Sequence, residues 1–185
     1  SWYALGVGYL AVMIAVVPLA LAAYRGKLHE RASIQDSGRA RLILWGHTAE
    51  LTLRRPMLGH GIETARVLDE RTGATAPKLD GQPFAVRTGR HAHNIYLQAW
   101  FEMGLAGALA MLLAGLLIIR AGARSPPAAA AYVYATLAAG FVIAGLAWGL
   151  WQPWLAALYG LTTVALLVGV ALARGRGSSR PEPMS

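Results

Sequence analysis

The chain has 185 residues and a formal net charge of +8, yet 56% of its residues are hydrophobic and only 14% are charged. A soluble domain cannot bury so large an apolar fraction, and the charged residues separate apolar runs about as long as the ~20 residues that cross a bilayer. Cysteine is absent, which excludes disulfides, thiolate nucleophiles and thiolate metal sites. We therefore expect an all-α polytopic membrane protein with about four transmembrane helices.

The first expected transmembrane span covers residues 1–24. Its apolar part runs from Trp2 to Ala23, and aromatic residues near both ends, with Arg25 just beyond, are typical interfacial anchors. The chain begins with a serine rather than a methionine, and this first run lacks the basic n-region and the cleavage site of a signal peptide. We expect the chain to be a piece of a longer protein.

Residues 25–94 form a large polar loop with twelve basic and seven acidic side chains. Asp36 and Ser37 are expected to cap a short helix over about 38–54, because their side-chain oxygens can accept hydrogen bonds from its first turn. Pro56 predicts the end of that helix. The glycine- and proline-rich stretch 72–89 predicts an irregular loop.

Three further spans are expected within residues 95–173. Apolar runs cover 95–119, 128–150 and 155–173, and an aromatic turn at 151–154 joins the last two. Glu102 lies inside the first of these runs. A charged residue at membrane depth is a functional candidate by default, unless it lies at interface depth.

The short loops predict the orientation, because the excess of basic residues on the cytoplasmic side is strongest there. The linker 120–127 carries two arginines, the basic tail 174–185 carries three, and the turn 151–154 carries none. The linker and tail are expected to face the cytoplasm, which makes 25–94 an extracytoplasmic loop containing short helices. No nucleic-acid motif accompanies the basic charge, so the expected partners include membrane lipids and no nucleic acid.

His93-Asn94 stands where the polar loop meets the next span, and nine residues separate it from the glycine pair Gly104 and Gly107. Residue identity, fixed spacing and location at a loop–membrane junction make this pattern fairly specific. It resembles the signature of the O-antigen ligase and O-antigen polymerase superfamily, which also includes protein O-oligosaccharyltransferases.

A second pattern upstream is similar to the same family's sequence. Arg41 precedes Trp45 by four residues, and Pro56, Gly59 and Gly61 follow in a Pro-x-x-Gly-x-Gly arrangement. The resemblance covers about residues 37–107, and it implies that the chain is the C-terminal catalytic portion of a member of this superfamily.

The resemblance implies a metal-independent, inverting membrane glycosyltransferase that uses no cofactor. It would move a glycan from undecaprenyl diphosphate to an acceptor, with O-antigen ligation to lipid A core in lipopolysaccharide biosynthesis as the first choice. O-antigen polymerase and protein O-oligosaccharyltransferase stay open, because they share the motif and differ in using another glycan or a protein as acceptor. The implied location is the bacterial inner membrane, with the catalytic loop on the periplasmic face.

Within this interpretation His93 is the catalytic residue. Imidazole ordinarily titrates near neutral pH, which suits a general base that takes the proton of the acceptor hydroxyl. Arg41 would bind the diphosphate, since a guanidinium offers phosphate oxygens a permanently charged, planar fork. Arg87 and Arg90 are further candidates for diphosphate binding, although loop arginines are more often simply solvated.

The remaining motif residues are expected to support the site: Asn94, Trp45, Gly59, Gly61, Gly104 and Gly107. Asn94 would orient His93 or the local backbone, and the pair Gly104 and Gly107 would permit close helix approach. Arg39 lies about 200° around a helix from Arg41 and is therefore expected outside the site.

A metal site is not expected, because the His-x-His spacing of His91 and His93 has no nearby third ligand. A rival interpretation from another class is a non-catalytic membrane subunit or a transporter. In that case the basic loop would bind anionic lipid or a partner, and His93 would be a structural residue. Transfer by a His93→Ala variant that inserts normally would favour this rival.

Overall fold

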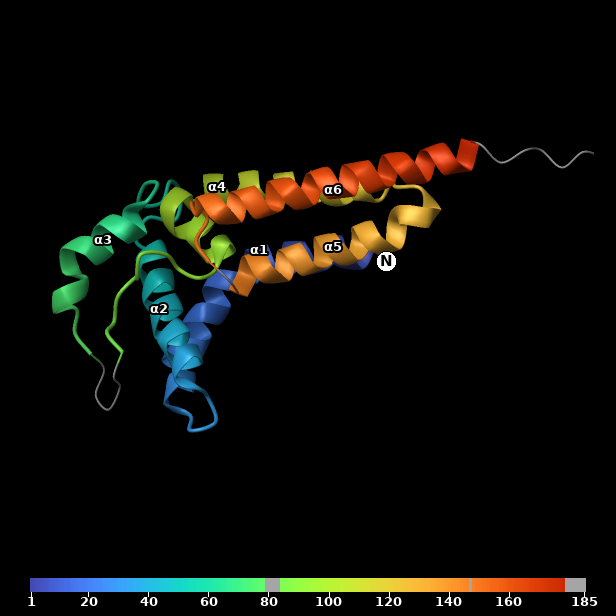
Figure 1. Cartoon of the computed structure of the whole chain (residues 1–185). Coiled ribbons are helices and arrows are strands. Elements are labelled where there is room, and N and C mark those ends of the chain that lie inside the picture. The colour runs from blue at the N-terminus through green and yellow to red at the C-terminus, as the bar shows by residue number, and fades with distance from the viewer. Residues whose placement is uncertain (79–83, 147, 179–185) are drawn as a thin grey trace, which may run out of the picture.

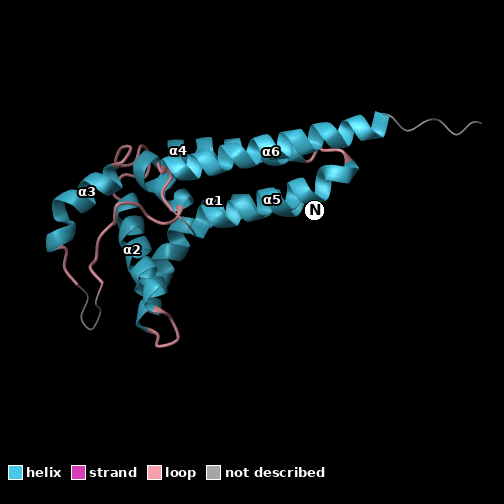
Figure 2. Ribbon diagram, viewed as in Figure 1, coloured by secondary structure: helices cyan, strands magenta, loops and turns pink. Residues whose placement is uncertain are grey.

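The computed structural model describes residues 1–78, 84–146 and 148–178, and within these residues the chain is helical and contains no β-strand (Figure 2). Four helices are long and apolar enough to cross a membrane: α1 (Trp2–Arg25), α4 (Ile95–Gly122), α5 (Pro127–Leu146) and α6 (Pro153–Ser178). Figure 1 shows these helices running alongside one another, with the shorter helices gathered at one end of the bundle. The predicted all-α polytopic membrane fold is confirmed.

The centre of the bundle lies where α1, α4 and α5 meet. The Tyr9 ring of α1 stacks on Phe141 of α5 with 4.6 Å between ring centroids, and its hydroxyl donates to the carbonyl of Met111 in α4 at 2.7 Å. A side chain at Gly115 would collide with the Tyr9 ring, so this glycine lets α1 and α4 approach. The Trp100 indole adds a second bond between these helices, 2.8 Å to the carbonyl of Met13.

A tight connection containing the 3-10 turn η1 (Leu28–Glu30) reverses the chain into α2 (Asp36–Thr52), which packs along the C-terminal half of α1 (Figure 1). The predicted helix therefore exists, but the predicted cap is wrong. Asp36 and Ser37 lie inside the first turn, and the N-cap is Gln35, whose side chain makes no capping bond. Asp36 is still favourable there, because a negative charge suits the positive end of the helix dipole.

The rest of the polar loop contains α3 (Thr64–Thr72) and the short 3-10 turn η2 (Gly73–Thr75). The stretch predicted as irregular loop is therefore partly helical at its start. Residues 79–83 of that stretch lie outside the described residues. The chain then returns to the bundle and enters α4, so α2 and α3 both lie at the same end as the start of α4 (Figure 1).

Helix α4 is interrupted at Gly104, where φ is 61° and ψ is −153°. Backbone in this region is essentially restricted to glycine. Around the break, four backbone groups that would bond to one another in a continuous helix bond to the loop 56–61 instead. The loop donates two of these bonds, from the N–H of His60 to Phe101 O (2.9 Å) and from the N–H of Gly61 to Glu102 O (2.8 Å). Helix α4 donates the other two, from the N–H of Leu105 to Pro56 O (2.8 Å) and from the N–H of Ala106 to Met57 O (3.3 Å).

Glycines allow this backbone-to-backbone contact on both sides. A Cβ atom on Gly104 would lie 2.6 Å from the Gly59 nitrogen, and a Cβ on Gly59 would lie 2.6 Å from the Gly104 nitrogen. The Pro-x-x-Gly-x-Gly pattern at 56–61 and the glycine pair that follows His93-Asn94 therefore meet in one contact. The close approach predicted for Gly104 occurs, but its partner is a loop rather than another helix.

The third predicted span is too long. Helix α5 ends at Leu146 rather than at residue 150, and α6 begins at Pro153, a residue type suited to the first position of a helix. Gly149 lies outside both helices and packs against the loop before α4, where a Cβ on it would be 2.5 Å from the Cβ of His91. This contact turns the chain over the polar end of the bundle instead of extending α5.

The two basic segments lie at the other end of the bundle. The α4–α5 linker, which contains Arg124 and follows Arg120 in the last turn of α4, and the C-terminal end of α6 both lie opposite α2 and α3 (Figure 1). Residues 179–185 of the predicted tail lie outside the described residues. This arrangement agrees with the predicted orientation, which stays a prediction because the helices alone do not identify the membrane or its two sides.

Candidate active site

His93 lies in the short segment that leads into α4. Its backbone is left-handed, with φ of 52°, a conformation that costs an ordinary residue roughly 1–2 kcal/mol and in which histidine is enriched among non-glycine residues. The next residue, Asn94, is the N-cap of α4, and its Oδ1 accepts a hydrogen bond from the N–H of Leu97 at 3.0 Å. The start of α4 therefore fixes the backbone that carries the imidazole.

Trp45 of α2 fixes the same segment from the other side. Its indole Nε1 donates to the carbonyl of Ala92, 2.6 Å away and one residue before His93. The ring of His93 lies 4.3 Å from that of His91 and 5.6 Å from that of Trp148, measured between centroids. The half-buried His93 side chain therefore lies beside the aromatic rings of His91 in the loop and Trp148 in the α5–α6 connection.

Arg41 lies one turn before Trp45, so both side chains project from the same face of α2. Its guanidinium donates to the carbonyl of Leu146, the last residue of α5, at 3.0 Å. No ion pair with an acidic side chain engages Arg41 within the described residues. As predicted, Arg39 is elsewhere, donating to the carbonyls of Arg31 and Ile34.

The other two arginines expected at the diphosphate pair with acids of α3. Arg87 lies 3.4 Å from Asp69, and Arg90 lies 3.5 Å from Glu70. Partly exposed pairs of this kind contribute only about 0–1 kcal/mol, so a phosphate group could compete for either guanidinium. Their role in diphosphate binding stays a prediction, and of the three arginines only Arg41 is positioned without a competing acid.

An apolar groove of about 670 Å³ runs between α1 and α5. Most of its lining consists of apolar side chains of these two helices, and the rest comes from α2 and the start of α4. The lining includes Leu146 at the end of α5, Trp45 of α2 and Asn94, the N-cap of α4. The groove therefore reaches the residues that position Arg41 and His93.

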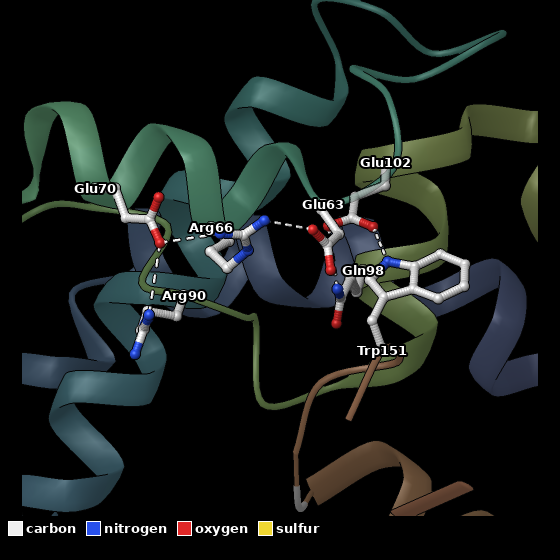
Figure 3. Close-up of polar contacts among 7 residues, drawn as sticks. All are labelled: Glu63, Arg66, Glu70, Arg90, Gln98, Glu102 and Trp151. Carbon is white, nitrogen blue, oxygen red and sulfur yellow. Dashed lines mark hydrogen bonds and ion pairs between the residues drawn. The ribbon is translucent and has the colours of Figure 1, made fainter. Parts of the chain in front are cut away.

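A separate polar cavity of about 320 Å³ has His91 in its lining, together with residues of α3, α4 and the α5–α6 connection. Figure 3 shows the polar contacts around it. Gln98 Nε2 donates to one oxygen of Glu102 at 3.1 Å, and the indole of Trp151 donates to the other. The backbone N–H of Leu150 donates to Gln98 Oε1 at 2.8 Å, which ties the α5–α6 connection to α4.

His91 is the least satisfied side chain near the site. Both ring nitrogens are buried and have no hydrogen-bond partner within the described residues. Burial, followed by the proximity of His93 and Arg90, lowers the pKa of His91 to about 4, so its ring is neutral near pH 7. No group of three or more His, Asp or Glu side chains that could hold a metal ion occurs in the described part of the chain.

Sequence reasoning missed the network around Glu102. Glu102 was singled out only as a charge at membrane depth, and Gln98 and Trp151 were not candidates at all. The spacing of Gln98 and Glu102 by four residues places them on one helix face and was a visible signal. The contact with Trp151 depends on how the α5–α6 connection folds, which the spacing does not reveal.

A family model described as O-antigen ligase matches residues 1–112 of the chain, a segment that contains Arg41, Trp45, His93 and both glycines of the Gly104/Gly107 pair. The searches of curated proteins and of solved structures give no match.

Proposed function

The chain belongs to the O-antigen ligase family, whose members are membrane enzymes of glycan transfer, and on this premise we propose that it moves a glycan from undecaprenyl diphosphate to an acceptor hydroxyl. We take lipid A core as the acceptor, which is O-antigen ligation. One observation carries the proposal. The apolar groove is lined by Leu146, whose carbonyl accepts a hydrogen bond from Arg41, and by Asn94, the residue after His93, and within the described residues no acid pairs with Arg41.

The groove and Arg41 suit two groups of the donor. A polyprenyl chain is apolar, so the groove between α1 and α5 suits it. The diphosphate follows the chain and carries negative charge, and Arg41 lies beside the groove residue Leu146. Bidentate hydrogen bonds from the guanidinium would hold the phosphate oxygens and stabilise the charge that develops on the leaving group.

His93 supplies the base. In the proposed reaction the acceptor oxygen bonds to the anomeric carbon of the donor sugar while the bond from that carbon to the diphosphate breaks. His93 takes the proton of the attacking hydroxyl, and attack from the face opposite the leaving group inverts the anomeric configuration. The bonds of Trp45 to Ala92 and of Asn94 to Leu97 hold the His93 backbone in place during this step.

The proposed location follows from the same chemistry. Lipid-linked O-antigen and lipid A core meet at the outer face of the bacterial inner membrane, so we place α2, α3 and His93 on the periplasmic side. The basic α4–α5 linker then faces the cytoplasm, which fits the distribution of arginines.

The test is glycan transfer in membranes of cells that express the whole protein, with products resolved by acceptor. We expect His93→Ala to lower transfer by roughly 10²–10⁴-fold at matched expression, the usual contribution of a general base. His93→Asn, which tolerates the left-handed backbone, should lose as much activity, because the base rather than the backbone is missing. His47→Ala, on α2 and outside the site, is the control and should transfer normally.

Full transfer by both His93 variants would show that His93 is not the base and would favour a non-catalytic subunit. Products on lipid A core support ligation, whereas elongated lipid-linked glycan or glycosylated protein would replace that acceptor with the one observed.

A further inference from the structure

We propose that the polar cavity beside His91 binds a sugar ring of the glycan that is transferred or of the acceptor, an inference that rests on the proposed function. Three parts of the chain build the cavity: α3, the segment from Arg90 into α4, and the α5–α6 connection (Figure 3). Its volume of about 320 Å³ is at the lower end of the roughly 300–1,000 Å³ of small-molecule sites. This is room for a sugar ring rather than for a long glycan.

The polar groups of α4 in this cavity are held in fixed positions. Glu102 is 1% exposed and Gln98 is 2% exposed, and the bonds among Gln98, Glu102 and Trp151 fix all three side chains. No lysine or arginine forms an ion pair with Glu102 in the described part of the chain. Each carboxyl oxygen can accept a further hydrogen bond beyond the one it receives, so Glu102 is a pre-positioned acceptor for hydroxyl groups.

The charges around the cavity favour a neutral ligand over an anion. Its lining contains two acids, Glu63 and Glu102, and two bases, Arg66 and Arg90. Arg66 is already bound by Glu63 at 2.6 Å and by Glu70 at 3.1 Å, and Arg90 is 3.5 Å from Glu70 (Figure 3). A phosphate in the cavity would have to displace two carboxylates from Arg66 and would face Glu102. Sugar hydroxyls both donate and accept, so they suit carboxylates and guanidinium groups together.

Two further groups match the chemistry of a sugar. Trp151 is partly exposed, and because its N–H is bound to Glu102 its ring is held at a fixed angle, where it could pack against the apolar C–H face of a pyranose. The neutral His91 ring has one donor and one acceptor nitrogen, both unsatisfied within the described residues. Unsatisfied buried polar atoms are rare, and a bound hydroxyl is a group able to satisfy them.

The position of the cavity also fits. His91 lines the cavity, the ring of His93 lies 4.3 Å from it, and Asn94 lines the apolar groove. Along the chain, His93 therefore stands between a site for an apolar chain and a polar cavity. A lipid-linked glycan has the same order, with the reacting carbon between the lipid diphosphate and the sugars.

Binding of a free glycan tests the cavity without the transfer reaction. The probes are the oligosaccharide released by mild acid from the lipid carrier of the source cells and the core oligosaccharide released by mild acid from lipid A, each added separately to the purified whole protein in detergent and followed by ligand-observed NMR. We expect wild type and His93→Ala to bind one of the two, and Glu102→Gln and Trp151→Phe to bind that oligosaccharide at least tenfold more weakly. Glu50→Gln and Trp2→Phe, which change the same residue types at positions that do not line the cavity, should bind as wild type does.

The second arm measures transfer while the lipid-linked donor and the acceptor are varied separately. A raised KM for the donor in the cavity variants assigns the cavity to the transferred glycan, and a raised KM for the acceptor assigns it to the acceptor sugar; either result supports the proposal. Trp151→Phe keeps the test valid if Glu102→Gln does not fold, since Trp151 lies on an exposed connection.

The two proposals fail in different ways. Transfer that depends on His93 but is unchanged in Glu102→Gln and Trp151→Phe overturns the cavity assignment and leaves the proposed function intact. Glycan binding that depends on Glu102 in a protein that transfers nothing overturns the proposed function and leaves the sugar site. Displacement of the glycan by inorganic pyrophosphate at equal concentration would show an anion site and overturn the sugar assignment.

Discussion

Replacement of Gly104 with alanine is expected to break the contact between α4 and the loop 56–61. A Cβ at this position would lie 2.5 Å from the carbonyl carbon of Met57 and 2.6 Å from the nitrogen of Gly59, both of them backbone atoms that cannot rotate away. The backbone of Gly104, at φ 61° and ψ −153°, is also outside the region that alanine adopts. The loop 56–61 must therefore move.

The magnitude follows from the bonds that this movement breaks. Four backbone hydrogen bonds join the loop to the break in α4, and each contributes about 1 kcal/mol net. The strained conformation adds roughly 1–3 kcal/mol for a residue with a Cβ. We expect Gly104→Ala to destabilise the protein by on the order of 5 kcal/mol, or to release the loop if the rest of the bundle holds.

Two assays distinguish global destabilisation from local release of the loop. Heating in detergent followed by size-exclusion chromatography reports global stability, and trypsin cleavage after Arg54 reports release of the loop in native membranes. Gly160→Ala in α6 is the matched control, because a Cβ there meets no atom within 4 Å, and it should be neutral or stabilising by up to about 1 kcal/mol. Equal melting and equal trypsin resistance of Gly104→Ala and wild type would refute the reasoning.

Three further predictions concern the residues around the base. Arg41→Ala should raise the KM for the lipid-linked donor at least tenfold in a transfer assay. Arg41→Lys keeps the charge but loses the planar fork, so its KM should lie between those of wild type and Arg41→Ala. Asn94→Ala should lower stability by about 1 kcal/mol in thermal unfolding, whereas Asn94→Asp retains the capping oxygen and should lose less. The pKa of His91 is about 4 in the folded chain, below the usual 6.5, so the unfolded state binds more protons and stability should fall as pH drops from about 6.5 towards 4, by at most about 1.4 kcal/mol per pH unit. A titration of the unfolding temperature should show this loss in wild type and a flatter curve in His91→Gln.

The fold was predictable because membrane spans are encoded locally. A run of about 20 apolar residues must form its hydrogen bonds within itself when water is absent, so composition alone indicates a helix and its approximate length. The predictions differ from the structure at the ends of helices. Helix α2 begins at Asp36 without a side-chain capping bond from Gln35, and the chain after α5 packs Gly149 against His91; no local pattern contains either feature.

The candidate site was only partly predictable, for a related reason. His93, Asn94, Arg41 and Trp45 were identified by spacing that resembles a family, and the structure brings three of them together through the bond of Trp45 to Ala92 and the capping bond of Asn94. Arg87 and Arg90 were grouped with them on charge alone. Charge does not reveal that both guanidinium groups pair with acids of α3.

The sequence by itself determined the helical class, the four membrane-length helices, the polar loop between the first two and the residues most suited to a base and a phosphate ligand. Only the tertiary structure decided that the loop 56–61 docks on the break at Gly104, that Arg41 stands at the end of α5, and that Trp151 closes a polar cavity with Glu102. The physical reason is the sequence separation over which each kind of interaction acts. Apolar length and periodicity act between neighbours along the chain, whereas these contacts join segments far apart in sequence, where the orientation of a backbone group or a side chain is set by the packing of the whole bundle.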